Sequence, residues 1–185
     1  MINIPKRYGS LKFSGLITWN MIFRRWEEAE SYQETWKKHW EGRGFESWRE
    51  WREDYISPFK PASLKWFLFQ ITDPVKDSLS MFGVPSKTWS KLAYAGETTK
   101  RLQEIKNLPI VFENPKVIAI RENFPQKTLL TAVVNDGRIV LVEGMHRSCA
   151  LATWPTEKDC FEEVFLALAV WKKEIPTIGG NFKRN

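Results

Sequence analysis

The stretch that decides the fold reads Asn135-Asp136-Gly137-Arg138-Ile139-Val140-Leu141-Val142-Glu143-Gly144-Met145-His146-Arg147-Ser148-Cys149-Ala150-Leu151-Ala152. Its Asn-Asp-Gly sequence, between apolar runs, predicts a β-hairpin turn, because a tight turn needs residues that tolerate positive φ. The β-branched run at 138–142 has the composition and length of a strand. Residues 145–152 favour a helix, with small side chains that let it lie close to a sheet. The stretch therefore predicts a turn, a strand and a helix in direct succession.

The start of that helix is a candidate phosphate site. Gly144 opens the helix, and a helix N-terminus presents free backbone N–H groups and the positive end of a dipole, which suits an anion. His146 and Arg147 add side-chain donors in the first turn. The planar guanidinium of an arginine also matches the oxygens of a phosphate.

The segment Glu143-Gly144-Met145-His146-Arg147 resembles the signature of the ParB/sulfiredoxin superfamily, in which Gly-x-His-Arg opens a helix that grips a nucleotide phosphate. The motif is closest to that of the free-serine kinases of this superfamily, Asp-Gly-His-His-Arg. Glu143 matches the acid, and Met145 replaces the first histidine. Sulfiredoxins carry their reactive cysteine where this chain has Met145, so their chemistry is not expected here.

The resemblance implies an α/β (α+β) domain with a small mixed sheet, and a nucleoside triphosphate such as ATP as the ligand. The implied chemistry is that of a phosphotransferase or a nucleotide hydrolase, with Mg²⁺ bound beside the phosphates. Glu143 and His146 are the implied catalytic residues, and no metal site made by side chains alone is expected. The implied phosphate-binding residues are Gly144, Met145, His146, Arg147 and Ser148.

Each of these roles has a structural alternative that the sequence leaves open. Arg147 can form a salt bridge to Glu143 instead of binding phosphate, and Glu143 can cap the helix dipole or orient Arg147. His146 can hold the turn through a backbone carbonyl. Cys149 follows His and Arg, but its place among alanines indicates a small buried packing residue and not a nucleophile.

We expect a helical, Trp-rich extension at residues 1–61 that packs on an α/β domain at residues 62–185. Ser31 and Glu34 form a capping box that predicts a helix from Tyr32, and Ser47 is a candidate cap for another helix at 45–55. The tryptophans at 26–51 have helical spacing, which favours packing over the stacking of nucleobases.

The remaining elements are expected in the middle and at the end of the chain. Residues 64–72 predict a buried strand, and Asp73-Pro74 predicts the start of a helix that runs to residue 81. Further helices are expected at 86–95 and 98–107. The other expected strands are 110–113, 116–121, 129–135 and the part of 161–171 that begins at residue 164.

Composition limits the classes of protein. A chain of 185 residues that is 43% hydrophobic supports a single core, and two cysteines without a signal-peptide pattern favour a cytoplasmic protein. The apolar runs have strand length, so no membrane contact is expected. A net charge of +6 fits a nucleotide and also nucleic acid. The alternative function is therefore a non-enzymatic module that binds nucleic acid or protein.

Overall fold

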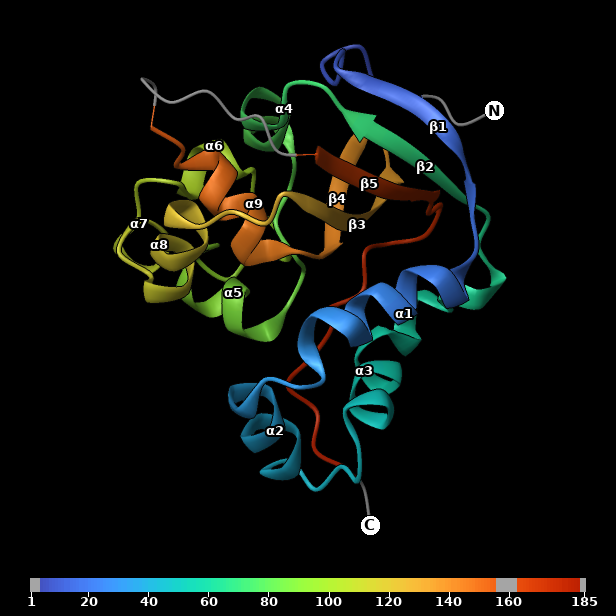
Figure 1. The fold of residues 1–185 in the computed structure, drawn as a ribbon, viewed down its shortest axis with the longest axis vertical. Coiled ribbons are helices and arrows are strands. Elements are labelled where there is room, and N and C mark those ends of the chain that lie inside the picture. Colours follow the sequence, from blue (N-terminus) through green and yellow to red (C-terminus); the bar gives the residue numbers. More distant parts are fainter. Residues whose placement is uncertain (1–3, 156–162, 184–185) are drawn as a thin grey trace.

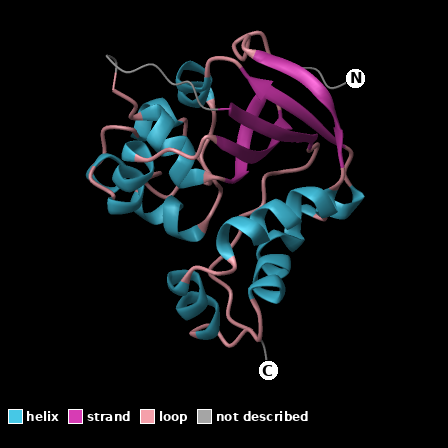
Figure 2. Ribbon diagram, viewed as in Figure 1, coloured by secondary structure: helices cyan, strands magenta, loops and turns pink. Residues whose placement is uncertain are grey.

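The structure is a computed structural model that describes residues 4–155 and 163–183. Within these ranges the fold is mixed α+β, with a five-stranded sheet and nine α-helices (Figure 1, Figure 2). The strands are β1 (Leu11–Ile17), β2 (Trp66–Ile71), β3 (Lys127–Asn135), β4 (Arg138–Glu143) and β5 (Glu163–Val170). Their spatial order is β1-β2-β5-β3-β4. Neighbouring strands are antiparallel except β3 and β5, which are parallel, so the sheet is mixed.

The hairpin between β3 and β4 confirms the predicted turn. Asn135 pairs with Arg138, and the two residues between them, Asp136 and Gly137, have φ values of 47° and 71°. Positive φ at both central positions is the geometry that Asn-Asp-Gly sequences favour, because it matches the right-handed twist of the flanking strands. The turn fixes the register of the β3–β4 pair, and β4 ends at Glu143, the first residue of the motif.

The helices form two groups that lie on different sides of the sheet (Figure 1). The first group is α1 (Trp19–Glu30), α2 (Glu34–Glu41) and α3 (Trp48–Ile56). The second group is α4 (Pro74–Ser80), α5 (Lys87–Leu92), α6 (Leu102–Ile105), α7 (Pro109–Phe112), α8 (Pro115–Glu122) and α9 (Met145–Ala152). No helix in the described ranges is long and apolar enough to cross a membrane.

Strand β3 contacts both groups of helices. Thr131 accepts a buried hydrogen bond of 3.0 Å from the indole N–H of Trp26 on α1. The preceding side chain, Leu130, lies against Gly144 at the start of α9. Because neighbouring side chains on a strand point to opposite faces, the two groups reach β3 from opposite sides. They meet again beyond the end of β4, where the motif lies.

The N-terminal part differs from the expected extension in one respect. Leu11–Ile17 forms an edge strand that pairs antiparallel with β2, so the sheet begins before the helices. From Trp19 onward the part is helical as expected. The capping box at Ser31 is wrong, because Ser31 ends α1 and Gln33 stands at the cap of α2. The division of the chain at residue 61 stays a prediction.

Other helix starts follow their local signals. The Ser47 hydroxyl accepts from the backbone N–H of Glu50 at 3.1 Å, which confirms the expected cap of α3. The Asp73 carboxylate accepts from the backbone N–H of Lys76 at 3.1 Å, with Pro74 in the first helical position. These caps satisfy backbone donors that a helix leaves without partners.

Two expected strands, 110–113 and 116–121, are wrong, because residues 109–112 form α7 and residues 115–122 form α8. Each helix has a proline in its first turn, and the Asn114 side chain caps α8 by accepting from the backbone N–H groups of Lys116 and Val117. The expected strands at 64–72, at 129–135 and from 164 onward are confirmed as β2, β3 and β5. Residues 161–162 of the last expected segment lie outside the described residues.

Candidate functional site

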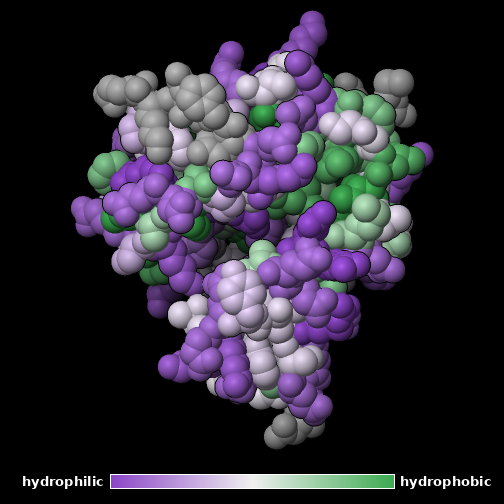
Figure 3. All heavy atoms as spheres, in the orientation of Figure 1, coloured by the Kyte–Doolittle hydropathy of each residue, from purple (hydrophilic) through white to green (hydrophobic). Residues whose placement is uncertain are grey.

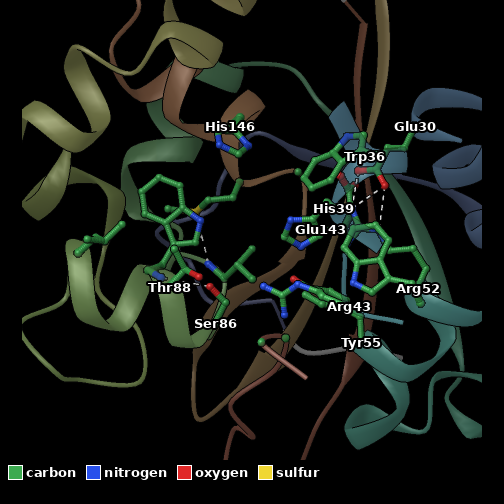
Figure 4. Close-up of a pocket in the computed structure, with 18 of the residues that line it drawn as sticks. Glu30, Trp36, His39, Arg43, Arg52, Tyr55, Ser86, Thr88, Glu143 and His146 are labelled. Atoms are coloured by element: carbon green, nitrogen blue, oxygen red, sulfur yellow. Dashed lines mark hydrogen bonds and ion pairs between the residues drawn. The ribbon is translucent and has the colours of Figure 1, made fainter. Parts of the chain in front are cut away.

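A cavity of about 290 Å³ lies where the start of α9 faces α1–α3 and α5. Figure 3 shows the surface hollowed between these parts, and Figure 4 shows the residues that surround the space. One wall consists of four motif residues, Glu143, Gly144, Met145 and His146. The structure therefore places most of the sequence-predicted site residues on one cavity.

Gly144 is required by the geometry of the turn into α9. Its φ is +93°, and a Cβ at this position would lie 2.5 Å from Cδ2 of Leu130. The next residue, Met145, is 5% exposed, and its sulfur accepts hydrogen bonds from the backbone N–H of Val84 and the hydroxyl of Tyr94. The Met145 side chain is therefore a packing element that fixes the helix start against the loop before α5.

Glu143 and Arg147 form a buried ion pair. Arg147 Nη2 lies 2.5 Å from Oε1 and 2.7 Å from Oε2 of Glu143, and its Nη1 donates to the hydroxyl of Thr128 at 2.6 Å. The Arg147 side chain is 19% exposed and does not line the cavity, whereas Glu143 does. Burial raises the pKa of Glu143, and the charge of Arg147 opposes that rise.

A second buried pair, which the sequence did not indicate, lines the cavity from the first helical group. Arg52 on α3 binds Glu30 at the end of α1, with Nε to Oε2 at 2.8 Å and Nη2 to Oε1 at 2.5 Å. The Arg52 guanidinium also lies over the rings of Trp51 at 4.4 Å and Tyr55 at 4.9 Å. Each carboxylate of the cavity wall is therefore matched by an arginine.

Two imidazoles that are distant in sequence, His39 and His146, line the same cavity (Figure 4). Burial lowers the pKa of His146 to about 4, and burial followed by nearby cations lowers the pKa of His39. Neither ring has a hydrogen-bond partner in the described part of the chain. A neutral imidazole offers one donor and one acceptor, so both rings have unused capacity for a ligand.

Further polar groups around the cavity come from the loop after α2 and from the start of α5. Arg43 donates to the backbone carbonyl of Asn181 at 3.1 Å, and its guanidinium points toward the cavity in Figure 4. Ser86 and Thr88 lie at the start of α5 and also line the space. These residues were not predicted from the sequence; Trp36 and His39 have the i, i+3 spacing of one face of α2, which is the local signal that points to His39.

Ser148 and Cys149, which follow the motif on α9, lie outside the cavity. Ser148 is fully buried, and among the described residues its hydroxyl has no hydrogen-bond partner. Cys149 is also fully buried, and burial raises the pKa of its thiol to about 12. Cys149 is thus a packing residue, in line with the sequence interpretation. Within 4–155 and 163–183, no three His, Cys, Asp or Glu side chains group as a metal site.

Comparisons with protein-family models, with curated proteins and with solved structures found no match for this chain.

Proposed function

We propose that the protein binds a nucleoside triphosphate in this cavity, and that it is a member of the ParB/sulfiredoxin superfamily. One observation carries the proposal: the cavity opens at the N-terminus of α9, and aromatic side chains line its other walls. A ligand that fills this space has an anionic part and a planar apolar part, which is the composition of a nucleotide.

The phosphates lie at the start of α9 in this proposal. The first N–H groups of a helix have no partner within the helix, and the helix dipole favours negative charge there. His146 adds an imidazole N–H at the same end, and Arg43 adds a positive charge from the opposite wall. Thr88 and Ser86 supply hydroxyl groups along the floor.

The charge of the wall is compatible with a polyanion. Glu30 and Glu143 both line the cavity, and either would repel a phosphate if it were unpaired. Each is bound by an arginine, so the pairs are close to neutral. The charge of Arg43 is added to these near-neutral pairs, so the net charge around the cavity is positive. Arg147 acts in this arrangement by holding Glu143, and its direct binding of phosphate stays a prediction.

The chemistry we propose is phosphoryl transfer or nucleotide hydrolysis. Glu143 is the cavity carboxylate whose pKa is raised, and a raised pKa suits a general base that works near neutral pH. Mg²⁺ would neutralise charge on the phosphates, and Glu143 is the motif oxygen donor on the cavity wall. Since Arg147 already occupies this carboxylate, the phosphates would supply most of the ligands to the metal ion.

The test compares the same substitution, Thr to Glu, at two positions, one on the cavity wall and one outside it. Thr88→Glu adds a carboxylate to the cavity wall, whereas Thr98→Glu adds one to an exposed position outside it. Glu is favourable in the first turn of a helix, so Thr88→Glu should not destabilise α5. Titration calorimetry with ATP, CTP and GTP, with and without Mg²⁺, should show about a tenfold or greater loss of affinity for Thr88→Glu. Thr98→Glu should bind like the wild type.

The proposal fails if none of the three nucleotides binds the wild-type protein or raises its melting temperature.

The second candidate, a non-enzymatic module that binds a partner, is favoured by an exposed apolar patch of Phe13 (63% exposed), Leu16 (63%) and Met21 (57%). Figure 3 shows this side of the molecule, over β1 and β2, as largely hydrophobic. Binding that changes in Phe13→Ser and not in Thr88→Glu would support that candidate.

A further inference from the structure

One tryptophan of the cavity, Trp89 on α5, packs at the edge of the core and is only partly buried. It lines the cavity. Its single ring contact in the described part of the chain is with His146, edge-on, at 5.8 Å between centroids and 62° between planes. Because this is the one ring contact of Trp89 among the described residues, at least one face of the indole has no aromatic neighbour.

The other cavity tryptophans are already engaged. Trp51 is 5% exposed, and the Arg52 guanidinium covers its ring at 4.4 Å. Trp36 packs against Trp51 at 5.4 Å, and the ammonium of Lys116 lies over it at 4.4 Å. These rings hold α2 and α3 together, which leaves Trp89 as the indole of the cavity wall that can accept a planar ligand.

Apolar and polar groups around Trp89 complement a heterocyclic ring. Val84 and Leu92 line the cavity beside it and supply apolar contact. His39 lies on the other side of the space in Figure 4, and its ring is fixed edge-on between Trp36 at 5.7 Å and Trp51 at 5.2 Å. Its nitrogens are free of hydrogen bonds within the described residues, and the edge of a nucleobase offers the donors and acceptors that they lack.

We propose that Trp89 and His39 form a nucleobase subsite, in which the base stacks on the indole of Trp89 and its edge bonds to the imidazole of His39. This rests on the proposed nucleotide function and adds the means of base recognition to it. The cavity of about 290 Å³ lies just below the usual range for ligand pockets, ~300–1,000 Å³, so the proposed ligand is a single free nucleotide and not a nucleic-acid strand.

His146 joins the two ends of the site. Its ring contacts the ring of Trp89, and its backbone belongs to the first turn of α9. The base subsite on α5 and the phosphate site on α9 therefore have a fixed separation. A ligand that has phosphates and no base loses the stacking contact and keeps the contacts at α9.

The experiment compares ATP with inorganic tripolyphosphate on the full chain by titration calorimetry. Trp89→Leu should weaken ATP binding roughly 5- to 150-fold, the range for one stacked base, and should leave tripolyphosphate affinity within about twofold. The matched control is Trp40→Leu, since Trp40 is a half-buried tryptophan on α2 that does not line the cavity. Trp40→Leu should change neither affinity.

His39→Phe is a second variant that keeps an aromatic ring and removes the nitrogens. It should reduce the differences in affinity among ATP, GTP and CTP while tripolyphosphate binds unchanged. If Trp89→Leu does not fold, Trp89→Phe takes its place in the experiment. Trp89→Phe keeps an aromatic ring, so it should retain most of the ATP affinity. Equal losses for ATP and tripolyphosphate in the variants, or equal affinities for the two in the wild type, would refute the base subsite and leave the phosphate site standing. A wild type that binds neither would refute the proposed function as well.

Discussion

Replacing Arg147 distinguishes a phosphate ligand from the partner of a buried carboxylate. Glu143 is 7% exposed, and both of its oxygens accept from Arg147. Arg147→Met keeps the aliphatic stem and removes the guanidinium, which leaves the carboxylate buried without its cation. Removing one partner of a buried ion pair destabilises a protein by about 3–5 kcal/mol. Because Arg147 is 19% exposed and water can partly replace it, we expect about 3 kcal/mol.

The pH dependence of that loss tests its cause. Burial raises the pKa of Glu143, whose ordinary value is 4.5, and Arg147 opposes the rise. A carboxyl group with a raised pKa in the folded state contributes its full stability below pH 4.5 and loses it as the pH rises through the folded-state pKa. Without Arg147 this loss is larger. Urea unfolding should therefore show the greatest deficit of Arg147→Met at pH 7–8, and a smaller deficit near pH 4.5.

The double variant Glu143→Gln/Arg147→Met should recover most of the stability at pH 7, because it removes the stranded charge. A deficit below about 1 kcal/mol at pH 7 would contradict the buried pair, since that is the size of an exposed ion pair. So would a deficit that does not change with pH. If Arg147 bound phosphate directly, nucleotide affinity in the folded single variant would instead fall by about 1.5–3 kcal/mol.

Three further predictions concern single positions. Gly144→Ala should destabilise the protein by about 1–3 kcal/mol more than Gly137→Ala in urea unfolding, because φ is positive at both but only at Gly144 does an added Cβ meet a neighbour; equal effects would exclude the steric contact. Burial lowers the pKa of His146 to about 4, so protonation of its ring destabilises the folded state as the pH falls. His146→Gln should therefore reduce the loss of stability between pH 6.5 and pH 4. An unchanged slope of stability against pH would contradict this. In a Cys160→Ser background, Cys149 should react with Ellman's reagent only after unfolding, and labelling of the native protein at neutral pH would show that the thiol is accessible.

The hairpin and the motif helix could be predicted because their signals are local. Asn-Asp-Gly demands positive φ wherever it stands, and a glycine between a strand and a helix fixes where the helix begins. The strands that follow this logic, β3 and β4, were predicted to within a few residues. Elements of this kind depend on their own residues more than on contacts with the rest of the chain.

The segments at α7 and α8 were misread because composition and capping disagree there. Residues 110–113 and 116–121 are rich in Ile and Val, which favour strands. Pro109 and Pro115 occupy first helical turns, where a missing N–H is harmless, and Asn114 caps α8. The expectation of strands did not take these three residues into account. Strand β1 was missed for a related reason, since Leu11–Ile17 is half exposed and alternates only weakly.

The motif wall of the cavity could be predicted, and the opposite wall could not. Glu143, Gly144 and His146 are adjacent in sequence, so a motif finds them. Glu30 and Arg52 meet only because α1 and α3 fold against each other, and no local pattern announces such a pair. His39 is far from His146 in sequence, and the two rings line one cavity only because the first group of helices folds over the motif.

Two buried arginine–glutamate pairs lie at the cavity wall, and their presence needs an explanation. Buried pairs seldom stabilise a fold more than apolar residues of the same volume, so stability alone does not account for Glu30–Arg52 and Glu143–Arg147. Both carboxylates line the space at the motif, and burial raises the pKa of Glu143. Each carboxylate is held by an arginine, so it repels a bound phosphate little. In the proposed function, Glu143 is then the acid–base group beside the anion site, a combination that phosphoryl transfer can use.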